Sequence, residues 1–344
     1  MNEKTIDVII AGRRKRHRRW VLVTLLLAGV TAVLCGLMLY FGNTVYPPET
    51  IWRVFQGEQI QGATFAVMTL RLPRLLAGLL AGFCFGMAGC VFQTLLRNPL
   101  ASPNIIGVTS GSSAAAVYCI LILKIGGIGA SAAAVAAGLL ITLLIYLLSQ
   151  GGGFSGGKLI LIGIGTQAVL NALINFMLLK AASHDVPSAM RWLSGSLNTI
   201  QMKDLPMLAG AMIICCPAVL VLGRILNILE LGEQSAITLG VAVNRTRIML
   251  VFSAVLLLAF ATATTGPIAF VAFLSGPIAK KLVGIGFPYE LPAGLCGAVL
   301  VLAADLIGQF AFTLKYPVGV ITGIIGAPYL IFLLIRTNQS GGTR

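Results

Sequence analysis

The chain has 344 residues, of which 58% are hydrophobic and only 10% are charged, and its mean hydropathy is +0.96. Soluble domains carry roughly 25% charged residues, so this composition excludes an ordinary water-soluble protein and indicates membrane helices. The net charge of +14 gathers largely in a basic cluster just before the first apolar run, which is typical of a cytosolic membrane anchor. We therefore expect membrane lipids, and not nucleic acid, as a partner. The cluster comprises Arg13, Arg14, Lys15, Arg16, Arg18 and Arg19.

Apolar runs of membrane-spanning length predict an all-α polytopic protein with about ten transmembrane helices in one domain, residues 20–336. A basic tail (1–19) precedes this domain and a short tail (337–344) follows it. An even number of spans places both termini in the cytosol, with 16 basic residues on the inner side and 8 on the outer side, as the positive-inside rule requires. The predicted spans are 20–41, 75–96, 105–123, 128–148, 159–180, 205–223, 248–264, 267–283, 291–310 and 317–335.

The stretch from Arg71 to Val108 is the most distinctive part of the chain. It opens with Arg71-Leu72-Pro73-Arg74 and closes with Asn98-Pro99-Leu100-Ala101-Ser102-Pro103. Between these motifs Gly78, Gly82 and Gly86 recur every fourth residue and so share one stripe of the second predicted span. Such a stripe lets another helix backbone approach closely, which predicts that this span packs inside the bundle.

These motifs resemble the signature of the iron–siderophore and cobalamin-type (FecCD-like) ABC transporter permeases, and the resemblance runs from about residue 50 to 336. The ending Tyr316-Pro317-Val318-Gly319-Val320 fits it as well. Two features depart from the family pattern: no histidine follows Gly276-Pro277, and Gln309 stands where the family often has arginine. The resemblance implies a type II ABC importer permease in the bacterial cytoplasmic membrane. It also implies a second permease chain (the same or a related one), two cytosolic ATPase subunits and an extracytoplasmic siderophore-binding protein.

At the outer end, the resemblance implies that Arg71 and Arg74 receive acidic side chains of the binding protein, with Lys315 as a candidate third contact. Arginine suits this role because its planar fork binds a carboxylate through two hydrogen bonds. The residues alone are equally compatible with simple membrane anchoring by long cationic side chains. At the inner end, the resemblance implies a cytosolic gate built from two segments, Asn98, Pro99 and Leu100 in one and Ser155, Gly156 and Gly157 in the other.

The second gate segment lies in the glycine-rich run before Lys158, which matches the opening of a phosphate-binding loop. Leu159 occupies the position of the required Ser or Thr and no strand precedes the run, so a nucleotide site is excluded. The longest cytosolic connection, 224–247, predicts a short helix with an apolar face, and its periodicity alone is also compatible with an interfacial helix that lies on the membrane surface. By resemblance this helix docks in a groove of the ATPase, which uses the ATP and Mg²⁺. The coupling residues are Leu231, Gly232, Glu233, Ala236, Leu239 and Gly240.

Asp305 is the one acidic residue inside a predicted span, and an intramembrane carboxylate is a functional candidate by default. It is either a structural hydrogen-bonding group, as in the family, or the proton carrier of a secondary transporter. The seven cysteines lie in apolar stretches without a CxxC pair, so we expect no metal site and no cofactor bound by this chain. We expect a non-enzymatic permease for ferric siderophores, with cobalamin or haem as the alternative cargo.

Overall fold

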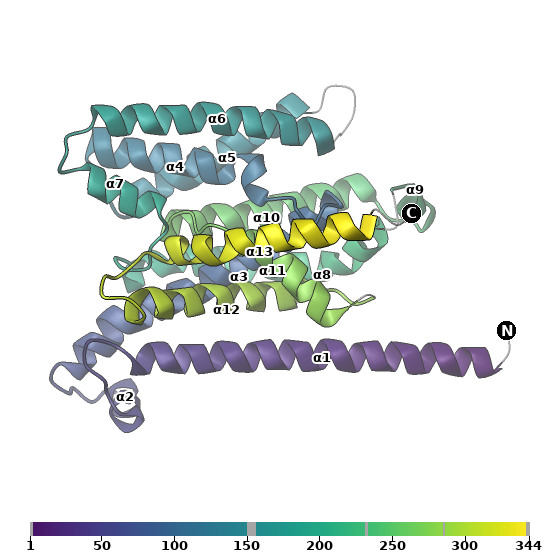
Figure 1. The fold of residues 1–344 in the computed structure, drawn as a ribbon, viewed down its shortest axis with the longest axis horizontal. Coiled ribbons are helices and arrows are strands. Elements are labelled where there is room, and N and C mark those ends of the chain that lie inside the picture. Colours follow the sequence, from purple (N-terminus) through teal and green to yellow (C-terminus); the bar gives the residue numbers. More distant parts are fainter. Residues whose placement is uncertain (1–2, 150–155, 231–232, 285, 342–344) are drawn as a thin grey trace.

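The computed structural model describes residues 3–149, 156–230, 233–284 and 286–341, and this part of the chain is helical, with no strand. The long helices run side by side in one bundle, with α1 at one edge and α4 to α7 at the other (Figure 1). The α-helices are α1 (Glu3–Tyr40), α2 (Pro48–Phe55), α3 (Leu72–Leu95), α4 (Val108–Tyr118), α5 (Ile128–Ser149), α6 (Gly156–Lys180), α7 (Val186–Leu193), α8 (Leu205–Glu230), α9 (Glu233–Thr238), α10 (Val243–Thr265), α11 (Val271–Val283), α12 (Glu290–Phe310) and α13 (Val318–Gly341). Four short 3₁₀ or π segments connect them: η1 (Phe65–Arg71), η2 (Pro103–Ile106), η3 (Cys119–Leu123) and η4 (Met202–Asp204).

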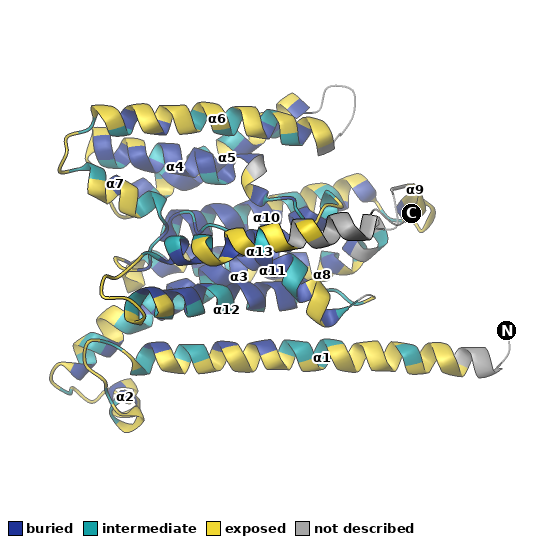
Figure 2. Cartoon of the chain, in the orientation of Figure 1, coloured by how far each residue is buried: buried dark blue, intermediate teal, exposed yellow. Residues whose placement is uncertain are grey.

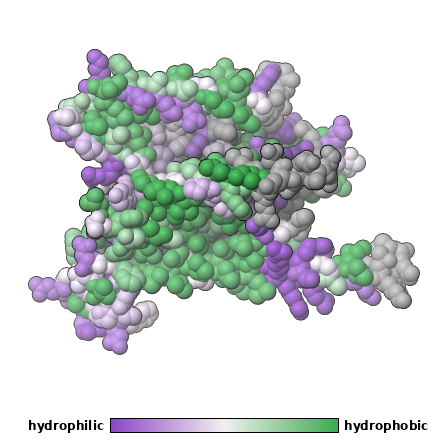
Figure 3. Space-filling model, in the orientation of Figure 1, coloured by the Kyte–Doolittle hydropathy of each residue, from purple (hydrophilic) through white to green (hydrophobic). Residues whose placement is uncertain are grey.

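Seven helices among the described residues are long and apolar enough to span a membrane. Two shorter apolar helices, Val108–Leu123 and Val318–Phe332, and the 13-residue α11 make up the other predicted spans. Figure 3 shows hydrophobic residues over the middle of the bundle and hydrophilic residues gathered at its two ends. The all-helical membrane class is confirmed, while the count of ten crossings stays a prediction.

Helix α3 forms the centre of the bundle, and 83% of its most apolar window is buried. The glycine stripe explains this position, because it brings the α3 backbone against α12. A Cβ added at Gly86 would lie 2.2 Å from the carbonyl oxygen of Ala293, and one added at Gly82 would lie 2.7 Å from that of Gly297. Figure 2 shows the consequence, with buried residues concentrated on α3 and its neighbours and exposed ones on α1 and α6. The predicted close helix–helix contact is confirmed.

Several helices begin or end away from their predicted limits. The first starts at Glu3, and not at residue 20, because the basic cluster is made of good helix formers and contains no proline. The second starts at Phe65 because the π-helical turn η1 runs without a break into α3, whose first turn contains Pro73, a position that tolerates a residue without an N–H group. The eighth starts only at Val271, after Phe270 takes a positive φ of 62°.

Candidate functional site

Arg74 and Asp305 form a buried ion pair near one end of the bundle, the end opposite the N-terminus. Arg74 lies at the start of α3 and Asp305 lies in α12, which packs along α3. The Arg74 Nε and Nη2 atoms donate to the two carboxylate oxygens of Asp305, each at 2.7 Å. The Asp305 side chain is completely buried, whereas that of Arg74 keeps 16% of its surface exposed. This is the two-pronged geometry in which arginine binds carboxylates most strongly.

Two amide side chains complete this group. Gln309 donates to Asp305 Oδ2 at 2.6 Å from one turn further along α12, and Arg74 Nη1 donates to the side-chain oxygen of Asn198. Gln309, which departs from the family pattern, thus supplies a donor to the same carboxylate. Because Asp305 accepts hydrogen bonds at both oxygens and is shut off from solvent, this geometry favours the structural role over a proton carrier.

Arg71 has a different role at the same end of the molecule. Its guanidinium donates to the carbonyl oxygens of Leu39 (2.6 Å) and Tyr40 (3.1 Å) in the last turn of α1, and to that of Thr44 just beyond it. It also lies 5.2 Å from the centre of the Tyr46 ring. Cations at a helix C-terminus satisfy carbonyl groups that have no partner within the helix. Arg71 therefore holds the end of α1 against η1.

The three predicted docking residues differ in what they offer to a partner. Lys315 is exposed and donates to the side-chain oxygen of Asn43 at 3.0 Å. Arg71 and Arg74 are both half-buried and already engaged by their own chain. A docking carboxylate would therefore bind beside these groups or compete with Asp305 for Arg74. Docking by these three residues remains a prediction.

At the opposite end, the turn after α3 has a defined conformation. Arg97 takes a positive φ of 48°, and the Asn98 side chain accepts a hydrogen bond from the Leu100 backbone N–H at 2.9 Å. One turn earlier, Gln93 donates to the carbonyl oxygen of Phe273 in α11 at 2.8 Å. A Cβ on Gly276 would lie 2.0 Å from Gln93 Oε1, so any larger residue next to Pro277 would force the Gln93 side chain to move.

The second predicted gate segment is described only in part. Ser155 lies outside the described residues, whereas Gly156 and Gly157 form the start of α6. That start packs near the first gate turn, because Leu159 in the first turns of α6 lines the same cavity as Leu96, just before the gate turn, and Ile106 of η2. The two segments therefore lie at the same end of the bundle, as expected, and their opening and closing remains a prediction.

The coupling segment contains the predicted short helix, α9, although Leu231 and Gly232 lie outside the described residues. Ala236 is fully buried and packs with Val243 against the bundle, while Ile237 and Leu239 are 59% and 64% exposed. Gly240 ends the helix with a φ of +80°, as the sequence suggested. Glu233 begins α9. This helix is thus fixed to the bundle through Ala236, and the helix and the turn after it present two large apolar side chains outward, Ile237 and Leu239.

Sequence reasoning missed a line of amide side chains on α6. Gln167, Asn171 and Asn175 recur every fourth residue, and the two asparagines are exposed while Gln167 is half-buried. Polar side chains facing hydrocarbon are costly, so this face of α6 requires water or another protein beside it. The i, i+4, i+8 spacing within an apolar run was the signal that could have found it.

A further ion pair lies between the loop segments at the end of the bundle that carries Arg74. Lys124 donates to Asp185 Oδ2, and His184 Nε2 lies 3.5 Å from the same oxygen. The hydrogen bond from Lys124 lowers the pKa of the Asp185 carboxyl, with a further contribution from the neighbouring His184. This pair joins the end of η3 to the start of α7.

Comparison with known proteins identifies the family. The FecCD transport family matches residues 25–336. The ferric enterobactin transport system permease protein FepG of Escherichia coli (strain K12) is 35% identical over 323 residues, which are 93% of this chain and 98% of that protein. The probable siderophore transport system permease protein YfhA of Bacillus subtilis (strain 168) is 35% identical over 335 residues, 94% and 96% of the two chains.

A solved structure agrees with these sequence relatives. It is described as an inward-facing conformation of a metal-chelate type ABC transporter, and it superposes with a TM-score of 0.81 at 27% identity over 91% of this chain and 99% of that one. The shared fold and the match over nearly the whole chain lead to one conclusion: this chain belongs to the FecCD transport family of ABC transporter permeases.

Proposed function

We propose that this permease carries ferric siderophore complexes inward across the bacterial cytoplasmic membrane, driven by two separate ATPase subunits and fed by an extracytoplasmic binding protein. The ATP and Mg²⁺ would be used by the ATPases, and this chain would bind no cofactor of its own. The relatives that carry siderophore names, matched over nearly their whole length, support the cargo.

The observation that carries the proposed coupling is the arrangement of α9. Ala236 is anchored in the bundle, while Ile237 of α9 and Leu239 of the turn after it project outward, and such a short apolar projection is suited to a groove on a partner. Movement of that partner would be passed to α8 and α10, which both contact α9. The start of α10 and the gate turn after α3 lie near one another, since Leu95 packs with Val243.

The amide line of α6 supports a path between two permease chains. A second chain, identical or related, placed against this face would enclose Gln167, Asn171 and Asn175 in a polar passage. Amides suit the oxygen-rich surface of a chelate, whereas the described residues contain no cluster of acidic, histidine or cysteine side chains that would bind a bare metal ion. In the proposed cycle the binding protein docks at the end that carries Arg71, Arg74 and Lys315, and the gates at the other end then part.

The test is uptake of ⁵⁵Fe-loaded siderophores in cells that lack this chain, restored with the wild type, Glu233→Arg or Arg71→Glu. We expect loss of uptake of one chelate class and rescue only by the wild type. Normal uptake of every iron chelate would contradict the cargo and redirect the assay to cobalamin and haem. Uptake that persists with the cognate ATPase inactivated would contradict the coupling, and Asp305→Asn would then test the proton-carrier alternative.

A further inference from the structure

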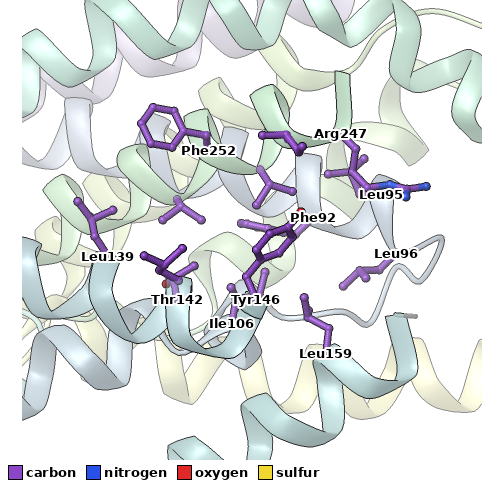
Figure 4. Close-up of a pocket in the computed structure, with 14 residues that line it drawn as sticks. Phe92, Leu95, Leu96, Ile106, Leu139, Thr142, Tyr146, Leu159, Arg247 and Phe252 are labelled. Atoms are coloured by element: carbon purple, nitrogen blue, oxygen red, sulfur yellow. The ribbon is translucent and has the colours of Figure 1, made fainter. Parts of the chain in front are cut away.

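A cavity of about 330 Å³ lies between α3, α5, α6 and α10, beside the two predicted gate segments (Figure 4). Phe92, Ile106 and Leu139 form part of its wall, which is almost entirely apolar. The hydroxyl of Thr142 lies in the wall but donates to the carbonyl oxygen of Gly138 at 2.8 Å, so it presents no unsatisfied group to the cavity. Such a wall offers water almost no hydrogen-bonding partner.

The cavity opens sideways, toward the outer surface of the bundle. Three lining residues, Leu143, Ile248 and Phe252, are 53%, 54% and 61% exposed. They lie on the apolar helices α5 and α10, within segments long enough to span the membrane. An occupant therefore reaches the cavity from the hydrocarbon phase.

Three cationic residues lie in the cavity lining or next to it in sequence. Arg247 is a lining residue, and Arg97 and Lys158 directly neighbour two other lining residues, Leu96 and Leu159. The four helices that build the cavity contain no aspartate or glutamate. The five donors of a guanidinium can serve a further acceptor beside an existing one. The site thus combines an apolar chamber with a cationic rim.

We propose that this cavity binds an anionic phospholipid, with an acyl chain inside and the phosphate at Arg247. A volume of 330 Å³ holds on the order of ten methylene groups, if each occupies roughly the ~30 Å³ of a water molecule. A siderophore complex does not suit this chamber, because its polar surface would find almost no hydrogen-bonding partner in the wall. A lipid held here would lie between Leu96 and Leu159, which adjoin the two gate segments.

The experiment uses the full chain, with its partner subunits where they co-purify, in nanodiscs that contain lipids with dibrominated acyl chains. A Tyr146→Trp substitution places a fluorophore in the cavity wall, and the parent protein with its three native tryptophans gives the background. We expect dibromo-phosphatidylglycerol to quench this tryptophan at lower mole fraction than dibromo-phosphatidylcholine, by about fivefold for one cation near the headgroup.

Arg247→Gln should abolish this preference, whereas Arg245→Gln should keep it. Arg245 is the matched control because it lies two positions before Arg247, which turns its side chain to about the opposite face of α10. Equal quenching by both lipids would overturn the headgroup contact, and no quenching by either would show that another occupant, such as a second permease chain, fills the cavity. Circular dichroism of each variant would verify folding, and the readout is independent of which chelate the permease carries.

Discussion

Replacing Asp305 with leucine leaves the Arg74 guanidinium without the two carboxylate oxygens that it contacts at 2.7 Å. Hydrogen bonds to charged groups contribute about 1.5–3 kcal/mol each, so the two together contribute on the order of 3–6 kcal/mol. Removing one member of a buried pair costs about 3–5 kcal/mol in measured cases. Because Arg74 keeps 16% exposure and can turn toward water, we expect Asp305→Leu to lower the free energy of unfolding by about 3 kcal/mol.

A double-mutant cycle separates the pair from its surroundings. Arg74→Met together with Asp305→Leu removes both charges, and hydrophobic replacement of a whole buried pair is often neutral. The double variant should therefore be more stable than either single variant, with a coupling energy of about 2 kcal/mol or more. Equilibrium unfolding of the purified chain in mixed detergent–SDS micelles gives these free energies.

The exposed pair between Arg53 and Glu58 provides the control for this cycle. Its side chains are 57% and 46% exposed, so the same cycle there should give a much smaller coupling than the cycle at Arg74 and Asp305. If the losses at Arg74 and Asp305 simply add, to within about 0.5 kcal/mol, the bidentate pair does not exist in the folded protein and the reasoning above is refuted.

Three other predictions follow from the described contacts. Gly86→Ala should destabilise the bundle by about 1–3 kcal/mol, because its Cβ would strike the Ala293 carbonyl oxygen. Gly36→Ala in α1 is the control: it has open space around it, so it should be neutral or slightly stabilising in the same detergent–SDS unfolding experiment. Leu239→Asp should reduce siderophore uptake at least about tenfold without loss of folded protein, because it would place a charge in the proposed ATPase groove. Unchanged uptake would contradict the docking of α9. The hydrogen bond from Lys124 lowers the pKa of Asp185, so its contribution to stability is present above pH 3.8 and is lost as the pH falls through the lower folded-state value. The difference in unfolding midpoint between wild type and Asp185→Asn should therefore shrink with acidification below about pH 4, and a constant difference would contradict the pair.

Local patterns in the sequence were sufficient for the helical membrane class, for the family and for the central position of α3. Apolar length and the four-residue glycine repeat depend only on neighbouring residues along one helix, so they can be read without knowing how helices meet. The short coupling helix and the glycine that ends it were predicted for the same reason. Helix limits were less accurate, because good helix formers extend α1 to Glu3 and the π-helical segment η1 adds Phe65–Arg71 before α3.

The partners of the charged groups were decided only by the tertiary structure. Arg74 and Asp305 lie 231 positions apart, and the sequence assigned them separate roles at a docking surface and inside a membrane span. The close packing of α3 on α12 brings them together, and Gln309 then supplies a further donor to the carboxylate. Side-chain pairing depends on which helix faces meet and at what depth, and a single sequence carries no direct record of either. The apolar cavity between α3, α5, α6 and α10 likewise exists only because four separate helices leave space between them.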